Sequence, residues 1–164
     1  MTERNYTNRF TVPRPPAEVY DAICHVQAWW SEGIEGQALR VGDRFTHSVL
    51  DLHRCDLQVV EMVPHTRIVW KVLENHFSFT QDKTEWNDTH IVFDILPHGS
   101  GTELRFTHVG LVPEYECHDI CRDGWNTYVA SLRDLILTGS GRPNVGKAIT
   151  GSEARLMRQT KQAS

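Results

Sequence analysis

The chain has 164 residues, of which 40% are hydrophobic, and a formal net charge of −4. This length suits one domain with its own core, and the acidic surplus argues against nucleic acid as the main partner, because phosphate binding needs clustered lysine and arginine. No apolar run is long enough to span a membrane and no basic and apolar leader is present, so we expect neither a membrane span nor a signal peptide. The four cysteines lack CxxC spacing, which favours reduced thiols and a cytoplasmic protein.

The first predicted elements are a strand and a helix. Apolar and polar side chains alternate over Tyr6–Val12, as in a half-buried strand. The sequence PRPP then ends the strand, because proline cannot donate to a sheet and suits the first turn of a helix. A buried helical stripe follows, formed by Val19, Ala22, Ile23 and Val26. We expect two short helices here, and then glycine-rich turns in EGQALRVGD.

Five further strands are predicted, at Arg44–Leu50, His53–Val63, Arg67–Asn75, Thr89–Leu96 and Thr102–Leu111. The sequence PHGSG between the last two is typical of a tight hairpin, because its glycines can adopt positive φ angles. The alternation within His53–Val63 is ambiguous, since Leu57 and Val59 compete with Val60 and Met62 for the buried face. A β-bulge in this strand would explain the ambiguity.

A long helix is predicted at residues 113–137, with a length of about 37 Å at the usual helical rise. Its apolar stripe consists of Trp125, Tyr128, Val129, Leu132, Leu135 and Ile136, and Cys121 and Cys117 continue it backward. The sequence GSGRPN ends the helix. Residues 139–164 form a polar tail with a charge of +4, beside −8 for residues 1–138. We therefore place the domain at residues 5–138 and expect a flexible tail.

These elements predict an α+β fold. A six-stranded antiparallel sheet with one apolar face must cover that face, and the long helix is the only predicted element large enough to do so. The sheet then has to curl around the helix, and such an arrangement leaves a cleft near one helix end.

The same order of elements resembles the START-like (SRPBCC) helix-grip superfamily, in particular the branch related to the C-terminal domain of the heat-shock ATPase activator. The resemblance covers residues 5–138 and rests on VPRPPAEVYDAI, WW with VGDRF, VVEMVPHTRIVWKV, GSGTELRFTHVGL and DGWNTYVASLRDLI. It implies a helix-grip fold. It also implies a functional range, since members bind lipids, sterols, polyketides or aromatic compounds, and some are cyclases or dehydratases; a fold alone does not choose among these.

A cleft between sheet and helix would be lined by inward-facing side chains. Leu104 and Phe106 share a strand face with His108, which can contact a ligand there or serve as a structural hydrogen-bonding group; the sequence favours neither. The candidate lining residues are Trp70, Phe93, Phe106, His108, Cys121, Trp125, Tyr128 and Val129, with Trp29 and Trp30 at the cavity mouth. Ordinary core packing is the alternative for each aromatic residue, and for Phe93 and Phe106 it is the favoured one.

Metal binding and catalysis have weaker support in the sequence. Cys117 and Cys121 share a helical face, but His118 points away from it, and a further ligand such as His47, His53 or His108 would have to come from the sheet. We therefore expect no metal and no cofactor. No catalytic motif is present, so whether the chain is an enzyme stays open.

The sequence thus predicts a protein that binds a hydrophobic or aromatic small molecule between the sheet and the long helix. The first alternative is a cyclase or hydrolase that uses the same cleft, with His108 as the proton carrier. The second is a co-chaperone-like interaction module. The sequence does not distinguish a monomer from a homodimer.

Overall fold

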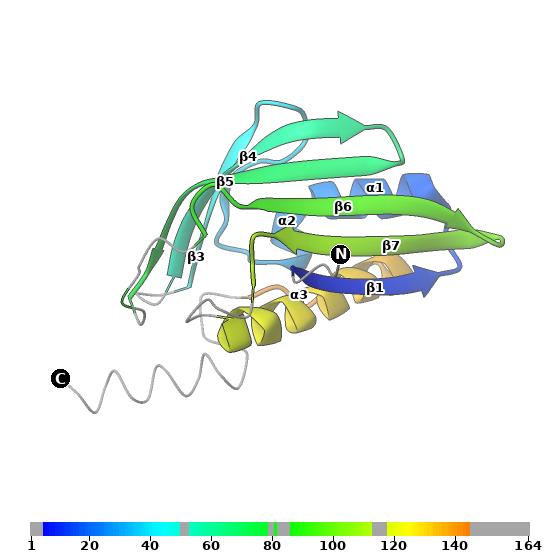
Figure 1. The fold of residues 1–164 in the computed structure, drawn as a ribbon. Coiled ribbons are helices and arrows are strands. Elements are labelled where there is room, and N and C mark those ends of the chain that lie inside the picture. The colour runs from blue at the N-terminus through cyan, green and yellow to red at the C-terminus, as the bar shows by residue number, and fades with distance from the viewer. Residues whose placement is uncertain (1–4, 50–52, 79–80, 82–85, 113–117, 145–164) are drawn as a thin grey trace.

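The computed structural model describes residues 5–49, 53–78, 81, 86–112 and 118–144 (Figure 1). The elements, in chain order, are β1 (Tyr6–Val12), α1 (Pro16–Cys24), α2 (Val26–Trp29), β2 (Glu35–Gly36), β3 (Arg44–Val49), β4 (His53–Val63), β5 (Arg67–Phe77), β6 (His90–His98), β7 (Gly101–Val109) and α3 (His118–Thr138). The two predicted short helices are α1 and α2. The five long strands after them begin and end within two residues of their predicted bounds.

All the strands form one antiparallel sheet with the order β1-β7-β6-β5-β4-β3-β2. The predicted count of six strands is one too low, because β2 lies where the sequence indicates only turns and pairs there with β3. Gly36 permits this pairing, since its φ is +96° and a Cβ atom would lie 2.3 Å from the Arg44 carbonyl oxygen. A strand of two residues has no periodicity from which it could be predicted.

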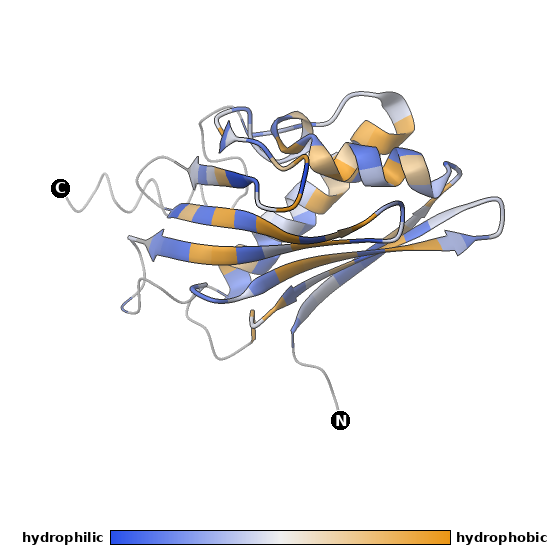
Figure 2. Cartoon of the chain, turned by 90° about the horizontal axis from the view of Figure 1, so that it is seen from above, coloured by the Kyte–Doolittle hydropathy of each residue, from blue (hydrophilic) through white to orange (hydrophobic). Residues whose placement is uncertain are grey.

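One face of the sheet packs on α3 (Figure 1). On β6 the side chains of Ile91, Phe93 and Ile95 point inward and are at most 2% exposed, as the alternation predicts. Hydrophobic and hydrophilic residues alternate along the strands in Figure 2, which agrees with one face against the helix and one toward solvent. The predicted helix-grip arrangement of a large antiparallel sheet and a C-terminal helix is confirmed.

The strand β4 carries the predicted irregularity. Its pairing with β5 shifts register between Asp56 and Leu57 and again between Val59 and Glu61. At the first shift, Asp56 pairs with Glu74, whereas the next residue, Leu57, pairs with Val72. Leu73 on β5 therefore has no partner on β4. Val72 and Asn75 are three residues apart on β5, yet both are buried. The bulge therefore turns the Asn75 side chain into the interior, where a regular strand would direct it outward.

The helix α3 buries the predicted stripe. Its buried residues are Cys121, Gly124, Trp125, Tyr128, Val129, Ser131, Leu132 and Ile136. Leu135, the remaining described member of the predicted stripe, is partly exposed. Residues 113–117, the predicted first turn with Cys117, lie outside the described part of the chain. Among the described helices, none is both long and apolar enough to cross a membrane.

The chain after α3 turns back and packs against the helices. The Arg142 backbone N–H donates to Ser131 Oγ at 2.6 Å. The Asn144 N–H donates to the Trp30 carbonyl, and the Asn144 carbonyl accepts from the Glu32 N–H, each at 2.9 Å. Asn144 is completely buried. The packed part of the chain therefore reaches Asn144, six residues beyond the boundary predicted at 138, and the remainder of the predicted tail lies outside the described residues.

A chain that ends at Gly139 should be less stable than one that ends at Asn144. The shorter chain loses these three hydrogen bonds, and also the one from Asn144 Nδ2 to Tyr128 Oη and the exposed contact of Arg142 with Asp134. It also leaves the Trp30 carbonyl without its partner, so we expect its free energy of unfolding to fall by about 2–4 kcal/mol. The melting temperature should fall by on the order of 10 °C. Urea and thermal unfolding of both chains measure this, and the chain ending at Asn144 controls for the loss of residues 145–164. Equal stability of the two chains would show that residues 140–144 do not stabilise the domain and would support the predicted boundary at 138.

Candidate functional site

All five tryptophans of the sequence lie inside the domain, and none is more than 4% exposed. Trp30 is central among them: its ring is parallel to that of Trp70 at a centroid distance of 5.9 Å and lies 5.0 Å from that of Trp125. Trp86 stacks on Trp125 at 5.8 Å. The interior between the sheet and α3 is therefore walled by flat aromatic rings.

Polar side chains gather at one end of this interior. In an antiparallel sheet the end of one strand lies beside the start of the next, so the ends of β3, β5 and β7 meet the starts of β4 and β6 at one edge. Inward-facing or buried polar residues occur on β3, β4, β5 and β7 and immediately before β6. We call this group the polar end: His47, His53, Asn75, Thr89 and His108. Trp86 and the first turns of α3, with Trp125, lie against it.

His108 is held by hydrogen bonds at both ring nitrogens. Trp125 Nε1–H donates to His108 Nδ1 at 3.0 Å, which leaves the His108 proton on Nε2. Nε2 then donates to Thr89 Oγ1 at 2.8 Å, and this hydroxyl donates to the Trp86 carbonyl at 2.6 Å. Burial, with smaller contributions from His53 and His90, lowers the pKa of His108 to about 3. His108 is therefore a neutral link between sheet and helix, which favours the structural alternative of the two that the sequence left open.

His47 and His53 are close neighbours at the polar end. Their ring centroids are 5.7 Å apart, and His47 stacks on Trp30 at 4.4 Å. His53 Nε2 donates to Asn75 Oδ1 at 2.6 Å. Burial and the neighbouring His53 hold the pKa of His47 well below its usual range, and burial lowers the pKa of His53 to about 4. Both imidazoles are therefore neutral at physiological pH.

Some buried polar atoms of this region have no hydrogen-bond partner among the described residues. They include His47 Nδ1, Asn75 Nδ2 and Trp70 Nε1. A buried polar atom without a partner costs about 1–3 kcal/mol of stability. Such atoms are rare in native proteins, and ordered water or a ligand often accounts for them. The polar end therefore offers unused hydrogen-bonding capacity within an aromatic interior.

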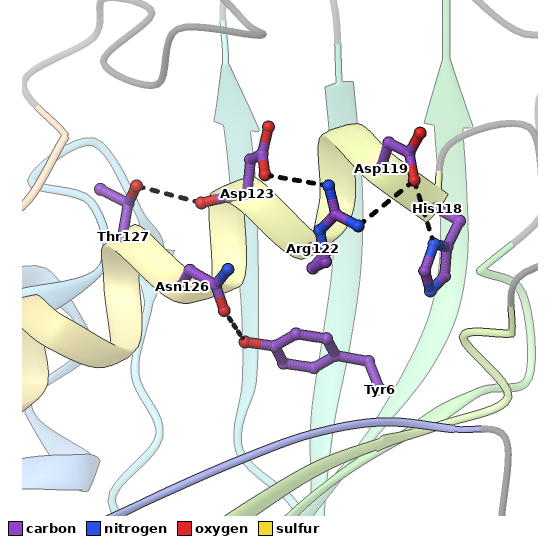
Figure 3. A network of polar contacts seen from close by, with 7 residues as sticks. All are labelled: Tyr6, His118, Asp119, Arg122, Asp123, Asn126 and Thr127. Atoms are coloured by element: carbon purple, nitrogen blue, oxygen red, sulfur yellow. Dashed lines mark hydrogen bonds and ion pairs between the residues drawn. The ribbon is translucent and has the colours of Figure 1, made fainter.

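The helix α3 docks on the edge strand β1 through a hydrogen bond between Tyr6 and Asn126 (Figure 3). Tyr6 Oη donates to Asn126 Oδ1 at 2.5 Å and accepts from Asn8 Nδ2 at 3.1 Å. Burial raises the pKa of Tyr6 to about 12, so the phenol keeps its proton. Exposed ion pairs of Arg122 with two aspartates add little stability. Because Asn126 follows Trp125, this contact fixes the rotation of the helix that turns Trp125 inward.

The structure places the predicted site residues inside the domain but gives them different surroundings. Buried between the sheet and α3 are Trp70, Phe93, Phe106, His108, Cys121, Trp125, Tyr128 and Val129. Phe93 contacts Trp29, Trp70 and Phe106, so its environment is that of ordinary core. Trp29 and Trp30, expected at a cavity mouth, are at most 1% exposed and pack in the core.

Five residues of this region were not among the predicted lining residues. They are His47, His53, Asn75, Trp86 and Thr89. From the sequence, the two histidines were considered only as possible metal ligands. The signal for His47 was its position two residues after Phe45, on the same inward face of β3. Among the described residues no three of His, Cys, Asp and Glu are grouped as metal ligands would be. Cys117 lies outside the described residues, so the cysteine pair is not seen.

The outer face of the sheet carries a competing hollow of about 880 Å³, lined by residues of β1, β5, β6 and β7. Its arginines are largely paired with carboxylates. Arg67 contacts Glu61 at 2.9 Å and Asp94 at 2.6 Å, and Arg105 contacts Glu103 at 2.5 Å. Because these charges are exposed and already paired, they would attract a charged ligand only weakly.

Comparison with known proteins identifies the family. The family model described as Activator of Hsp90 ATPase homolog 1-like protein matches residues 13–136. No curated protein matches the chain. Among solved structures, the Aha1 dimer from Colwellia psychrerythraea has a TM-score of 0.67 and 23% identity, covering 86% of this chain and all of that one.

Two further structures show the same fold. Protein MLL2253 from Mesorhizobium loti has a TM-score of 0.66 and 20% identity, covering 81% of this chain and 96% of its own. DynU16, from the dynemicin biosynthetic locus, has a TM-score of 0.61 and 17% identity, covering 85% of this chain and 49% of its own. Because this family model matches most of the chain, the protein belongs to the family of Activator of Hsp90 ATPase homolog 1-like proteins.

Proposed function

We propose that this protein binds one small, largely apolar molecule inside the domain, against the polar end. The observation that carries the proposal is the presence of buried, unpartnered polar atoms, such as His47 Nδ1 and Asn75 Nδ2, beside an otherwise apolar aromatic wall. Ligand sites of this kind combine aromatic walls with a few polar groups that fix orientation.

A ligand accounts for these atoms better than tight packing alone does. Elsewhere in the polar end the hydrogen-bonding atoms do have partners within the protein, since both ring nitrogens of His108 are bonded, to Thr89 and to Trp125. His47 and Asn75 are 2% and 4% exposed, so bulk solvent does not compensate them. A ligand group that bonds to them would recover part of the 1–3 kcal/mol that each unpartnered atom costs.

The enzyme alternative has less support. Its proposed proton carrier, His108, already uses both ring nitrogens within the protein, and burial lowers its pKa to about 3. A general acid or base works best with a pKa near the working pH. Binding without catalysis is therefore the function that the geometry supports best.

The indole N–H signals in a ¹H–¹⁵N correlation spectrum provide the test. Because Trp30 and Trp125 are central to the interior, a fragment from a library of small aromatic molecules should shift their signals with a single-site isotherm. Native mass spectrometry of protein purified from its host should show a retained small molecule. The backbone signals of Thr7 and Arg9, beside the outer hollow, serve as the control.

Two results would contradict the proposal. One is a complete fragment screen in which no compound shifts the indole signals. The other is a set of binders that shift only the outer-face signals of Thr7 and Arg9.

A further inference from the structure

We infer that two copies of this chain associate through the free edge of β4 and the apolar side chains beside it, with Met62 facing Met62 of the second copy. The inference is independent of the proposed function, because this surface lies at the border of the sheet and not in the interior. Three observations carry it: a group of exposed apolar side chains, an open stretch of sheet edge, and a balanced set of charges around both.

Exposed apolar side chains gather beside the second half of β4. Among the described residues, five large hydrophobic side chains are at least 39% exposed. Four of them form what we call the apolar edge patch: Leu39 and Val41 in the loop before β3, and Val60 and Val63 on β4. The loop is held against the strand, because the Gly42 N–H donates to the Val59 carbonyl at 2.8 Å. Single exposed hydrophobic residues are normal on a protein surface, but a group of them marks an interaction site.

The same part of β4 is a free edge of the sheet. The strand β3 pairs with β4 only as far as Gln58, and the loop before β3 adds one more residue, Val59. Beyond Val59 no strand of the described chain lies on this side of β4, and Figure 1 shows this stretch at the upper border of the sheet. The Val63 carbonyl accepts from the Thr66 N–H in the turn to β5. Because the backbone groups of successive strand residues point to alternate sides, the N–H and C=O of Met62 point to the free edge.

A second copy of the same strand can pair with this edge. Unpaired N–H and C=O groups at a sheet edge are a template for a strand of another chain. An antiparallel pair centred on Met62 has a two-fold axis, so that each copy donates its Met62 N–H to the Met62 carbonyl of the other. In this register Glu61 lies opposite Val63 of the second copy, and no like charges are opposed. Pro64 has no N–H to donate and ends the pairing.

The charges around the patch favour a second copy over a strongly charged partner. Arg40 and Asp43 lie in the loop, and Glu61 pairs with Arg67, which is opposite Val63 on β5. Two charges of each sign therefore surround the patch, whereas residues 1–138 together carry −8. A surface without net charge attracts neither a basic nor an acidic segment over long range, and it does not repel its own copy.

The oligomeric state of the full chain tests the inference. The paired edge is short, so we expect a weak dimer with a dissociation constant on the order of 100 μM. Sedimentation equilibrium between about 10 μM and about 1 mM should show the average mass rising from one chain toward two. The Met62 amide signal in a ¹H–¹⁵N correlation spectrum should shift with concentration along the same isotherm.

Charged substitutions locate the interface. Val60→Lys places an ammonium group in the apolar contact of each copy and should raise the dissociation constant at least about tenfold. Val109→Lys is the matched control, because Val109 is the fifth exposed hydrophobic residue, is 39% exposed and lies on β7. It should change the dissociation constant by less than about twofold. If Val60→Lys does not fold, Val63→Lys provides the comparison.

Three outcomes would overturn the inference, wholly or in part. A mass of one chain at every concentration, with an unchanged Met62 signal, refutes the association. A dimer that persists unchanged in Val60→Lys and Val63→Lys refutes the assignment of its interface, whether or not Val109→Lys weakens it. A dimer that Val60→Lys weakens but that leaves the Met62 amide unshifted keeps the apolar edge patch and refutes the strand pairing. None of these results bears on binding in the interior.

Discussion

Lowering the pH from about 7 to about 5 should destabilise this protein steeply. His47 and His108 are at most 2% exposed, and burial lowers the pKa of both, that of His108 to about 3. The histidine pKa in the unfolded chain is about 6.5. Below that pH the unfolded chain binds protons that the folded protein excludes, so stability is complete above about 6.5 and is lost as the pH falls toward about 3.

While the unfolded chain carries the proton and the folded chain does not, each buried histidine lowers the free energy of unfolding by the equivalent of one proton per pH unit, on the order of 1 kcal/mol, so the two together should give a slope of about two protons. His53, with a pKa of about 4 and a partly exposed side chain, adds a smaller share. Urea unfolding at a series of pH values from about 7.5 to 4.5 measures the slope.

Two variants make this prediction specific. His47→Phe should reduce the slope by about one proton, while His98→Asn, at an exposed histidine, should leave it unchanged. A free energy of unfolding that stays constant between about pH 7 and 5 would contradict the prediction. An unchanged slope in His47→Phe would show that His47 is charged in the folded state or makes no contribution.

Replacing Trp30 with alanine should destabilise the folded protein severely. Its side chain is 1% exposed and contacts Trp29, Trp70, Trp125, Phe45 and His47 at centroid distances from 4.4 to 6.3 Å. Truncating a buried tryptophan to alanine costs about 3–5 kcal/mol through lost burial and the cavity that remains. Since domains have total stabilities of about 5–15 kcal/mol, a substantial unfolded population is expected at 37 °C.

Denaturant and thermal unfolding test this expectation. Trp30→Phe keeps an aromatic ring and should lose less stability, so the two variants should form a graded series. Val41→Ala, at a side chain that is 57% exposed, is the control and should change stability by less than about 0.5 kcal/mol. A loss below about 1 kcal/mol in Trp30→Ala would mean that the surrounding rings can close the cavity.

The fold followed from the sequence because its signals are local. Strand alternation and the helical stripe report which side chains face inward, and these patterns located the five long strands, α3 and the bulge in β4. The same parity placed His108 on the inner face with Leu104 and Phe106, where the structure has it. Periodicity is a property of neighbouring residues, so it is readable without knowing what they contact.

The surroundings of these residues depended on contacts that no local pattern contains. Whether His108 binds a ligand or joins the sheet to the helix was decided by Trp125 and Thr89, which are 17 and 19 residues away. Trp86 lies in a polar stretch without periodicity, and Asn75 turns inward because the register shift opposite β4 leaves Leu73 unpaired. Asn144 is buried because Trp30 and Glu32 offer it backbone partners. The sequence thus determined which faces are buried, whereas the tertiary structure decided which polar atoms are satisfied, because hydrogen-bond partners are set by three-dimensional proximity.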